Sequence, residues 1–473
     1  MTDDVYFASI TDLNARLKKR EFSTVELVRA FAERLEKLGP RFNALALPLT
    51  ESAVRKAKEV DAELKRERFR GPLQGIPFGA KDLLAVAGSP TTWGAKPYAA
   101  QVFDETATVL QKLDKTGSVL IGKLSMVELA GGGGYRIAGA SLFGPGLNPW
   151  DPTRWSGGSS SGPGSAVAAG LVPYALGSET SGSIITPAAF CGVTGLRPTY
   201  GLVSRHGAMA LSWTMDKIGP MCRSAEDCGL VLETIAGGDS KDPGSAGKSF
   251  YYTPQYSRKF EDLKFGIAAI DLEWAAPETR PVFAAALEVI RGIGAPVVET
   301  ALPDFPYGAL ADIVIGAEEA SVFETLITSG QVDQLADASQ AAGLRANLDL
   351  PARDYLRAMR IRSLVKQKFR ELFEGVDVLV APARYNVAPS AFEPFDGPDA
   401  AAAEPATRGM RDLIPAGNLA GLPGLSVPCG FVNGLPVALQ FVGPAFSENT
   451  LLALGREFQR RTDWHTKRPP AAA

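Results

Sequence analysis

The chain has 473 residues, of which 45% are hydrophobic and 21% charged, a composition typical of a soluble globular protein and unlike that of a disordered chain. Lys and Arg number 49 and Asp and Glu 52, so the net charge of −3 gives no basic footprint for nucleic acid. Two histidines and four cysteines, without a CxxC or HExxH motif, argue against a zinc site and against a disulfide framework.

The first 70 residues are predicted to form an N-terminal helical layer. Ser23 and Glu26 fit a capping box, apolar residues then recur on one face as far as Leu38, and Gly39-Pro40 ends this helix over 23–38. A second, charged helix is expected over 51–69, with a solvated outer face. The acidic start lacks the features of a signal peptide, which together with the sparse cysteines predicts a cytoplasmic location.

A long uncharged stretch follows in the middle of the chain. The 24 residues from Trp155 to Ser178 carry no charge, but 14 of them are Ser, Gly or Pro, which suits a buried interior better than a membrane span. Residues 137–196 as a whole contain three charged residues, Asp151, Arg154 and Glu179. Small residues let backbone approach a ligand closely, so the functional site is expected here.

The region from 240 to 410 has an alternating pattern. Strands are predicted over 264–269 and 296–300 with a helix over 281–291 between them, a βαβ unit that implies parallel pairing. A further strand is expected over 376–381. Residues 388–407, rich in Pro, Ala and Asp, fit either a flap or a plain surface loop, and 462–473 fits a frayed tail.

Three polar residues stand out in or beside the low-charge region. Lys81 lies in GIPFGAKD, Ser159 in GGSSSG and Ser183 in GSETSGSI, and the two serines are 24 positions apart. A serine hydroxyl needs a neighbouring base before it becomes a nucleophile. Neither His206 nor His465 is near a serine-rich turn, whereas a desolvated lysine can serve as that base.

These segments resemble the amidase signature family in both content and spacing. The resemblance continues through residues 187–201, 216–221 and 418–428, and runs from about residue 8 to residue 468. It implies an α/β fold: one large domain with a central mixed, twisted β-sheet covered by helices on both faces. Residues 71–473 would form the catalytic core, with 240–410 as a variable substrate-side region.

The resemblance also implies roles for individual residues. Ser183 would be the nucleophile, Ser159 a proton relay with a cis peptide bond to Gly158, and Lys81 the base. The backbone N–H groups of Thr180, Ser181 and Gly182, with that of Ser183, would form the oxyanion hole. Gly131, Gly132 and Gly133, from the run 131–134, would line the substrate channel, and no metal or cofactor would be needed.

Departures from the family pattern bear on the substrate. Glu179 stands where Asp is usual, Ser181 where Gly is usual, and Ile185 where Arg is common. The apolar Ile185 would be a substrate-side residue and argues against a polar, amino-acid-like substrate. We therefore expect hydrolysis of amides with apolar or aryl groups, with ester and carbamate (urethane) cleavage as side activities. A small-molecule substrate is expected as partner, without nucleic acid or membrane, and a homodimer is left open.

Two alternatives fit the same motifs. The first is the glutaminase subunit of a tRNA-dependent amidotransferase, which the stretch from Gly195 to Gly201 resembles closely, although Ile185 and the looser match beyond residue 240 argue against it. The second is a specialised hydrolase of peptide amides or cyclic oligoamides, which the sequence fits equally well.

Overall fold

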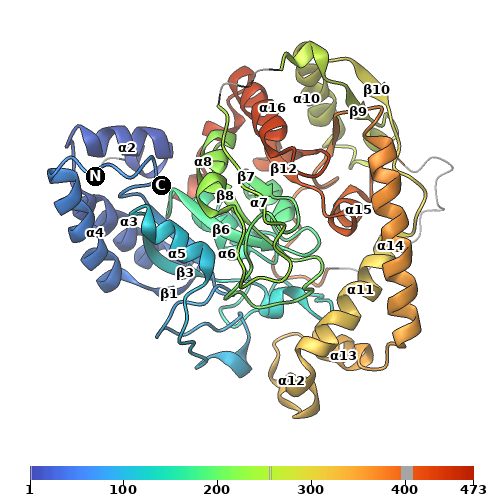
Figure 1. Ribbon diagram of the computed structural model, residues 1–473, viewed down its shortest axis with the longest axis horizontal. Coiled ribbons are helices and arrows are strands. Elements are labelled where there is room, and N and C mark those ends of the chain that lie inside the picture. The colour runs from blue at the N-terminus through green and yellow to red at the C-terminus, as the bar shows by residue number, and fades with distance from the viewer. Residues whose placement is uncertain (2, 255, 257, 396–408, 473) are drawn as a thin grey trace.

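The computed structural model describes residues 1, 3–254, 256, 258–395 and 409–472, and is organised around an eleven-stranded sheet (Figure 1). In spatial order its strands are β1 (Leu45–Pro48), β3 (Val119–Leu124), β2 (Pro77–Lys81), β6 (Tyr174–Glu179), β8 (Lys217–Cys222), β7 (Thr194–Arg197), β12 (Gly424–Val432), β13 (Leu435–Val442), β11 (Val378–Pro382), β9 (Phe265–Ile267) and β10 (Val297–Glu299). Strand β2 pairs in parallel with β3 and β6, and β9 with β10 and β11, while the remaining pairs are antiparallel. The predicted α/β fold with a central mixed sheet is confirmed.

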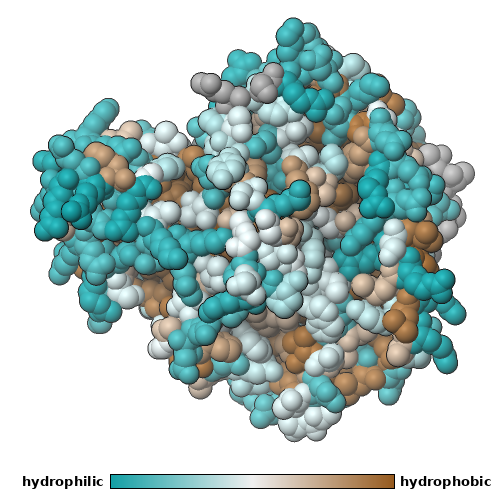
Figure 2. All heavy atoms as spheres, viewed as in Figure 1, coloured by the Kyte–Doolittle hydropathy of each residue, from teal (hydrophilic) through white to brown (hydrophobic). Residues whose placement is uncertain are grey.

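The N-terminal helices are α1 (Asp3–Tyr6), α2 (Ile10–Lys18), α3 (Thr24–Leu38) and α4 (Thr50–Lys65). The predicted capping box is present, because Ser23 Oγ accepts a hydrogen bond from Glu26 N–H and the Glu26 carboxylate accepts one from Ser23 N–H. The outer faces of these helices are largely hydrophilic in Figure 2, as expected of a solvated layer. The same region also supplies β1, which pairs with β3 in the central sheet.

The middle and end of the chain place further helices against the sheet: α5 (Thr108–Lys115), α6 (Ser161–Ala168), α7 (Ile185–Cys191), α8 (Ala225–Ile235), α15 (Leu413–Ala420) and α16 (Glu448–Arg461). Every residue of α6 and of α7 is buried, so the uncharged stretch forms protein interior as predicted. Among the described residues, no helix has the length and apolar character that crossing a membrane requires. A short hairpin of β4 (Leu147–Asn148) and β5 (Asp151–Trp155) precedes α6.

The region from 240 to 410 contributes α9 (Asp271–Trp274), α10 (Arg280–Gly292), α11 (Tyr307–Val322), α12 (Glu324–Thr328), α13 (Ala338–Asn347) and α14 (Ala352–Leu372). The predicted βαβ unit is confirmed, because β9 and β10 are parallel and α10 connects them. In Figure 1, α14 runs along one edge of the molecule, beside α11 and α13. Residues 396–407 of the segment expected to be a flap or loop lie outside the described residues.

The frayed C-terminal tail is the element for which the sequence prediction was wrong. The tail contains short 3-10 helices at Trp464–Thr466 and Pro470–Ala472, and Ala472 is buried. Two arginines hold it, since Arg34 donates to the Ala472 carbonyl and Arg223 donates to the Lys467 carbonyl. The tail is therefore ordered by donors from distant parts of the chain.

Candidate active site

Lys81 ends strand β2 with its side chain fully buried and its ammonium group among hydroxyl groups. Its Nζ lies 2.7 Å from Ser159 Oγ, 2.9 Å from Ser178 Oγ and 3.0 Å from Ser160 Oγ. None of the ion pairs among the described residues includes Lys81. The lysine is thus held by neutral acceptors rather than by a counter-ion.

This environment changes the acidity of the lysine. Burial lowers the pKa of Lys81 from 10.5 to about 7, against the smaller opposite effects of the Asp216 and Glu179 carboxylates. Desolvation penalises the charged form, and hydroxyl groups do not compensate for it as a carboxylate would. A substantial fraction of Lys81 is therefore neutral near pH 7 and can accept a proton.

The residue after Lys81 has a different partner. Asp82 Oδ1 lies 2.7 Å from Lys123 Nζ on β3, and both side chains are buried. The other oxygen of Asp82 accepts hydrogen bonds from the backbone and hydroxyl of Thr92. Asp82 is thereby occupied elsewhere, which leaves Lys81 without a neighbouring anion in direct contact.

The two serines lie on adjoining turns. The Gly158–Ser159 peptide bond is cis, as the resemblance implied. The Ser160 N–H donates to the Ser183 carbonyl at 3.3 Å, which ties the Ser159 turn to the turn that carries Ser183. The Ser183 side chain is buried, with 9% exposure, and its hydroxyl makes no hydrogen bond to a described residue. The structure therefore joins Lys81 directly to Ser159, and brings Ser183 beside them through the backbone.

The loop between β6 and α7 presents unused backbone donors. Within the described part of the chain, no hydrogen bond is donated by the N–H groups of Thr180, Ser181, Gly182 or Ser183. The next two N–H groups, by contrast, both bind one oxygen of Glu179, at 2.8 and 2.9 Å. These four successive N–H groups are therefore available to an acceptor, as the expected oxyanion hole would require.

Glu179 is the site residue whose role the sequence reasoning missed. Its other carboxylate oxygen accepts from Arg197 Nη1 and from Asn418 Nδ2, each at 2.8 Å, and both Glu179 and Arg197 are fully buried. These contacts lower the pKa of Glu179 to about 2 despite its burial. The available signal was its charge, since Glu179 is one of three charged residues in 137–196, and Asn418 opens a motif shared with the family.

The predicted substrate-side residues fall into two places. Gly133 packs against α13, because a Cβ atom on Gly133 would lie 2.2 Å from the Gln340 carbonyl, and its N–H donates to Glu319 at 2.9 Å. Ile185 is fully buried in a small apolar cluster that includes Ile414. Ile414 also lies beside the loop between β6 and α7, 3.2 Å from where a Cβ on Gly182 would be.

Aromatic side chains surround the turn that carries Ser159. A Cβ on Gly158 would lie 2.8 Å from the Trp155 ring and 3.0 Å from the Tyr135 hydroxyl. Phe395 packs on both rings, with its centroid 4.5 Å from that of Trp155 and 6.0 Å from that of Tyr135. Aromatic rings therefore line the Gly158 side of this turn, whereas Ser159 Oγ contacts Lys81.

The described residues contain no group of three or more His, Cys, Asp or Glu side chains that could hold a metal ion. His206 binds Glu105, 2.9 Å away, and is part of no such group. The absence of a metal or cofactor stays a prediction.

A comparison with curated proteins finds the A subunits of glutamyl-tRNA(Gln) amidotransferases. The protein of that name from Methylococcus capsulatus is 37% identical over 98% of this chain and 99% of its own length. Its name describes one subunit of an enzyme and includes a tRNA. The expectation of a small-molecule partner without nucleic acid is therefore wrong, because the relative is named as a subunit of a glutamyl-tRNA(Gln) amidotransferase.

Solved structures share the whole fold. The structure titled "An unexpected vestigial protein complex reveals the evolutionary origins of an s-triazine catabolic enzyme" has a TM-score of 0.86 and 28% identity, covering 96% of this chain and 98% of that one. Native peptide amidase from Stenotrophomonas maltophilia has a TM-score of 0.83 and 30% identity, covering 98% of each chain. The family model described as Amidase matches residues 26–452. The chain therefore belongs to the amidase signature family of hydrolases.

Proposed function

We propose that the chain hydrolyses amide bonds through an acyl-enzyme on Ser183, with Ser159 as the proton relay and Lys81 as the base. The observation that carries this proposal is the Lys81–Ser159 contact of 2.7 Å, made by a buried lysine whose pKa is lowered to about 7. A base is most effective when its pKa lies close to the working pH.

In the acylation step, neutral Lys81 accepts the Ser159 proton while Ser159 accepts that of Ser183. The Ser183 oxygen forms a bond to the substrate carbonyl carbon, and the carbonyl electron pair moves onto oxygen. The four free N–H groups of residues 180–183 stabilise that negative charge. When the C–N bond breaks, Ser159 gives its proton to the leaving nitrogen and regains one from Lys81.

In the deacylation step, water takes the place of the amine. The same relay removes one proton from the water, whose oxygen bonds to the acyl carbon. The C–O bond to Ser183 then breaks, the proton returns to Ser183, and the carboxylic acid leaves. Acid and amine are the products, and each catalytic group returns to its starting state.

For the substrate, we propose amides that carry apolar or aryl groups, with cleavage of esters and carbamates (urethanes) by the same acyl transfer. This proposal is supported by the apolar surroundings of the reacting turns, where Trp155, Tyr135 and Phe395 lie beside Gly158 and Ile414 beside Gly182. Within this proposal, Gly131 and Gly132 line the substrate channel, while Gly133 holds the loop on α13.

A panel of chromogenic anilides, aryl esters and aryl carbamates tests the proposal, with wild type and Ser183→Ala assayed side by side. We expect turnover of apolar members by wild type and its loss in Ser183→Ala. Equal turnover by both proteins contradicts the role of Ser183, and the absence of turnover with every member contradicts the substrate class.

A second candidate function is favoured by the curated relatives, namely the glutaminase subunit of a tRNA-dependent amidotransferase. It makes a distinct prediction, because glutamine hydrolysis would then appear or rise sharply when the purified chain is mixed with the other subunits of such an enzyme and with tRNA. Glutamine hydrolysis that these additions leave unchanged counts against this candidate.

A further inference from the structure

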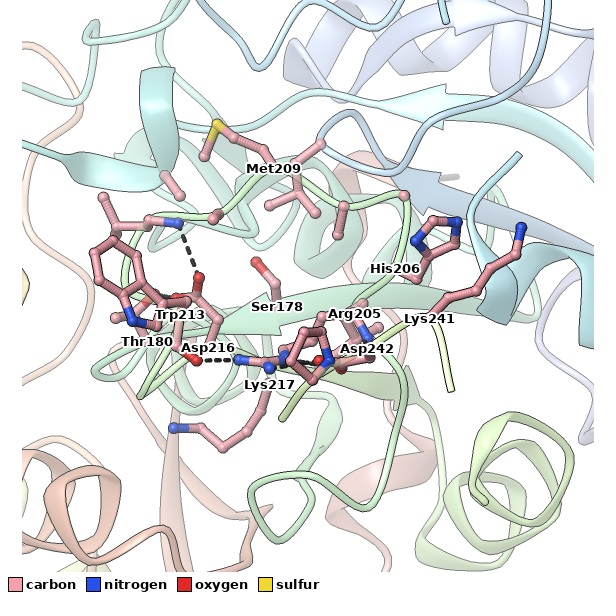
Figure 3. A pocket seen from close by; sticks show the side chains of 18 residues that line it. Ser178, Thr180, Arg205, His206, Met209, Trp213, Asp216, Lys217, Lys241 and Asp242 are labelled. Atoms are coloured by element: carbon pink, nitrogen blue, oxygen red, sulfur yellow. Dashed lines mark hydrogen bonds and ion pairs between the residues drawn. The ribbon is translucent and has the colours of Figure 1, made fainter. Parts of the chain in front are cut away.

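A cavity of about 290 Å³ lies beside the proposed site, between the end of β6 and the loop from Arg205 to Trp213 (Figure 3). Its apolar walls include Leu83, Met209, Leu211 and Ile218. Neither Ser159 nor Ser183 lines it, but Thr180 does, so the cavity adjoins the loop of the proposed oxyanion hole. An engineered apolar cavity of about 150 Å³ is large enough to bind benzene, so this one has room for an aromatic ring with a substituent.

One hydroxyl connects the cavity to the catalytic lysine. Ser178 lines the cavity, and its Oγ accepts a hydrogen bond from Lys81 at 2.9 Å. The same hydroxyl donates no hydrogen bond to a described residue, and in Figure 3 it points into the space between Trp213 and His206. It is therefore available to an acceptor in the cavity.

The other polar groups of the cavity are already paired. Asp216 accepts from Thr180 Oγ1 at 2.6 Å and from two backbone N–H groups. At the opposite end, Arg205 pairs with Asp242 at 2.6 Å, and His206 binds Glu105. Lys217 Nζ donates to the Met215 carbonyl, and Lys241 pairs with Glu105. Each charged group of the lining therefore has a partner within the chain, which favours a neutral ligand.

We propose that this cavity is a second small-molecule site, which binds a neutral apolar or aromatic molecule with one hydrogen-bond acceptor, and that its occupant acts on Lys81 through Ser178. Small-ligand pockets usually have mainly apolar walls and a few placed polar groups, as this cavity has. The bound molecule excludes solvent from the Ser178 side of Lys81, so it deepens the desolvation of Lys81 and favours the neutral lysine.

Acetophenone is a suitable probe, because it is a neutral aromatic ketone with no bond for an amidase to hydrolyse. Calorimetric titration is run on wild type, Ser183→Ala, Ala210→Phe and Ala210→Ser. Ala210 lines the cavity, so phenylalanine there fills it, whereas serine leaves the space open. We expect wild type, Ser183→Ala and Ala210→Ser to bind acetophenone with similar affinity. Ala210→Phe should bind it at least tenfold more weakly. Ser178→Ala, which removes the donor, is expected to weaken binding about fivefold, and thermal melting verifies that each variant is folded.

A measurement of turnover in the presence of acetophenone rests on the proposed function, whereas the calorimetric titration does not. Acetophenone is expected to change kcat and to move the acidic limb of the pH profile to lower pH, with a shift absent in Ala210→Phe. Strictly competitive inhibition, or binding that Ala210→Phe leaves unchanged, overturns the second site. Failure of the proposed function would appear separately, as undiminished turnover by Ser183→Ala.

Discussion

Lys81 Nζ lies 2.7 Å from Ser159 Oγ in a fully buried position where the hydrogen-bond acceptors are serine oxygens. The carboxylates of Asp216 and Glu179 act on it electrostatically and are bound to other groups. In such an environment the ammonium form of a lysine is disfavoured, so the side chain can act as a base at neutral pH. The proposed catalysis depends on this property, which has measurable consequences.

The first prediction concerns pH. With the pKa of Lys81 at about 7, kcat/KM should be low at pH 5.5, rise through pH 7 and level off above it, because the neutral lysine is the active form. A pH series with an anilide or aryl ester checks this.

Lys81→Ala should lose roughly 10²–10⁴-fold in kcat, the usual contribution of a positioned base. A variant with full activity and an unchanged pH profile contradicts the assignment of Lys81.

The second prediction concerns Glu179, which connects the oxyanion loop to Arg197 and Asn418. Glu179→Ala removes the acceptor for two backbone N–H groups and leaves Arg197 buried without its anion. Breaking one partner of a buried pair costs about 3–5 kcal/mol, so urea unfolding should show a large loss of stability. In folded enzyme, kcat should fall more than KM changes, because the proposed mechanism uses the loop donors in the transition state.

Glu179 also affects how stability depends on pH. The pKa of its carboxyl is about 2 in the folded protein, against an ordinary value of 4.5, so ionised Glu179 stabilises the fold above pH 4.5. That contribution is lost as the pH falls from 4.5 toward 2. The midpoint of urea unfolding for wild type should therefore decline over this range more steeply than for Glu179→Gln. Parallel curves for the two proteins would show that the carboxylate charge contributes nothing.

The third prediction concerns the packing of α13 on the glycine loop. A Cβ on Gly343 would lie 1.9 Å from the Gly133 carbonyl oxygen, so Gly343→Ala must displace the loop or the helix. We expect a raised KM and an altered order of preference within the substrate panel, with a smaller change in kcat. Ala342→Ser, at the exposed neighbouring position of the same helix, is the control and should behave as wild type. Identical kinetics for both variants would remove the loop from substrate selection.

Several features of the site were predictable from sequence, and others were not. Lys81, Ser159 and Ser183 could be proposed because each lies in a short motif of recognisable composition, and the sheet followed from the family resemblance. The partners Glu179, Arg197 and Asn418 are up to 239 positions apart, and no local pattern reports such a contact. The ordered tail was missed for the same reason, since its donors Arg34 and Arg223 belong to remote helices and loops.

The fourth prediction uses the position where this chain departs from its family. Ile185 is fully buried beside Ala189, Ala383, Ile414 and Ala438, so the side chain has no route to solvent. Restoring the family residue by Ile185→Arg would place a charge among aliphatic groups, and burial of an unpaired charge is among the most destabilising changes known.

We expect Ile185→Arg to lower the melting temperature sharply and to abolish turnover, whereas Ile185→Val, which removes one methylene, should cost about 0.5–1.5 kcal/mol and keep most activity. Thermal melting and the chromogenic panel measure both effects. A stable Ile185→Arg enzyme that gained activity on polar, charged amides would mean that the side chain at this position reaches the substrate. The apolar cluster would then be a specificity pocket that repacks around its ligand, and a preference for apolar substrates would be supported by the aromatic residues around Gly158 alone.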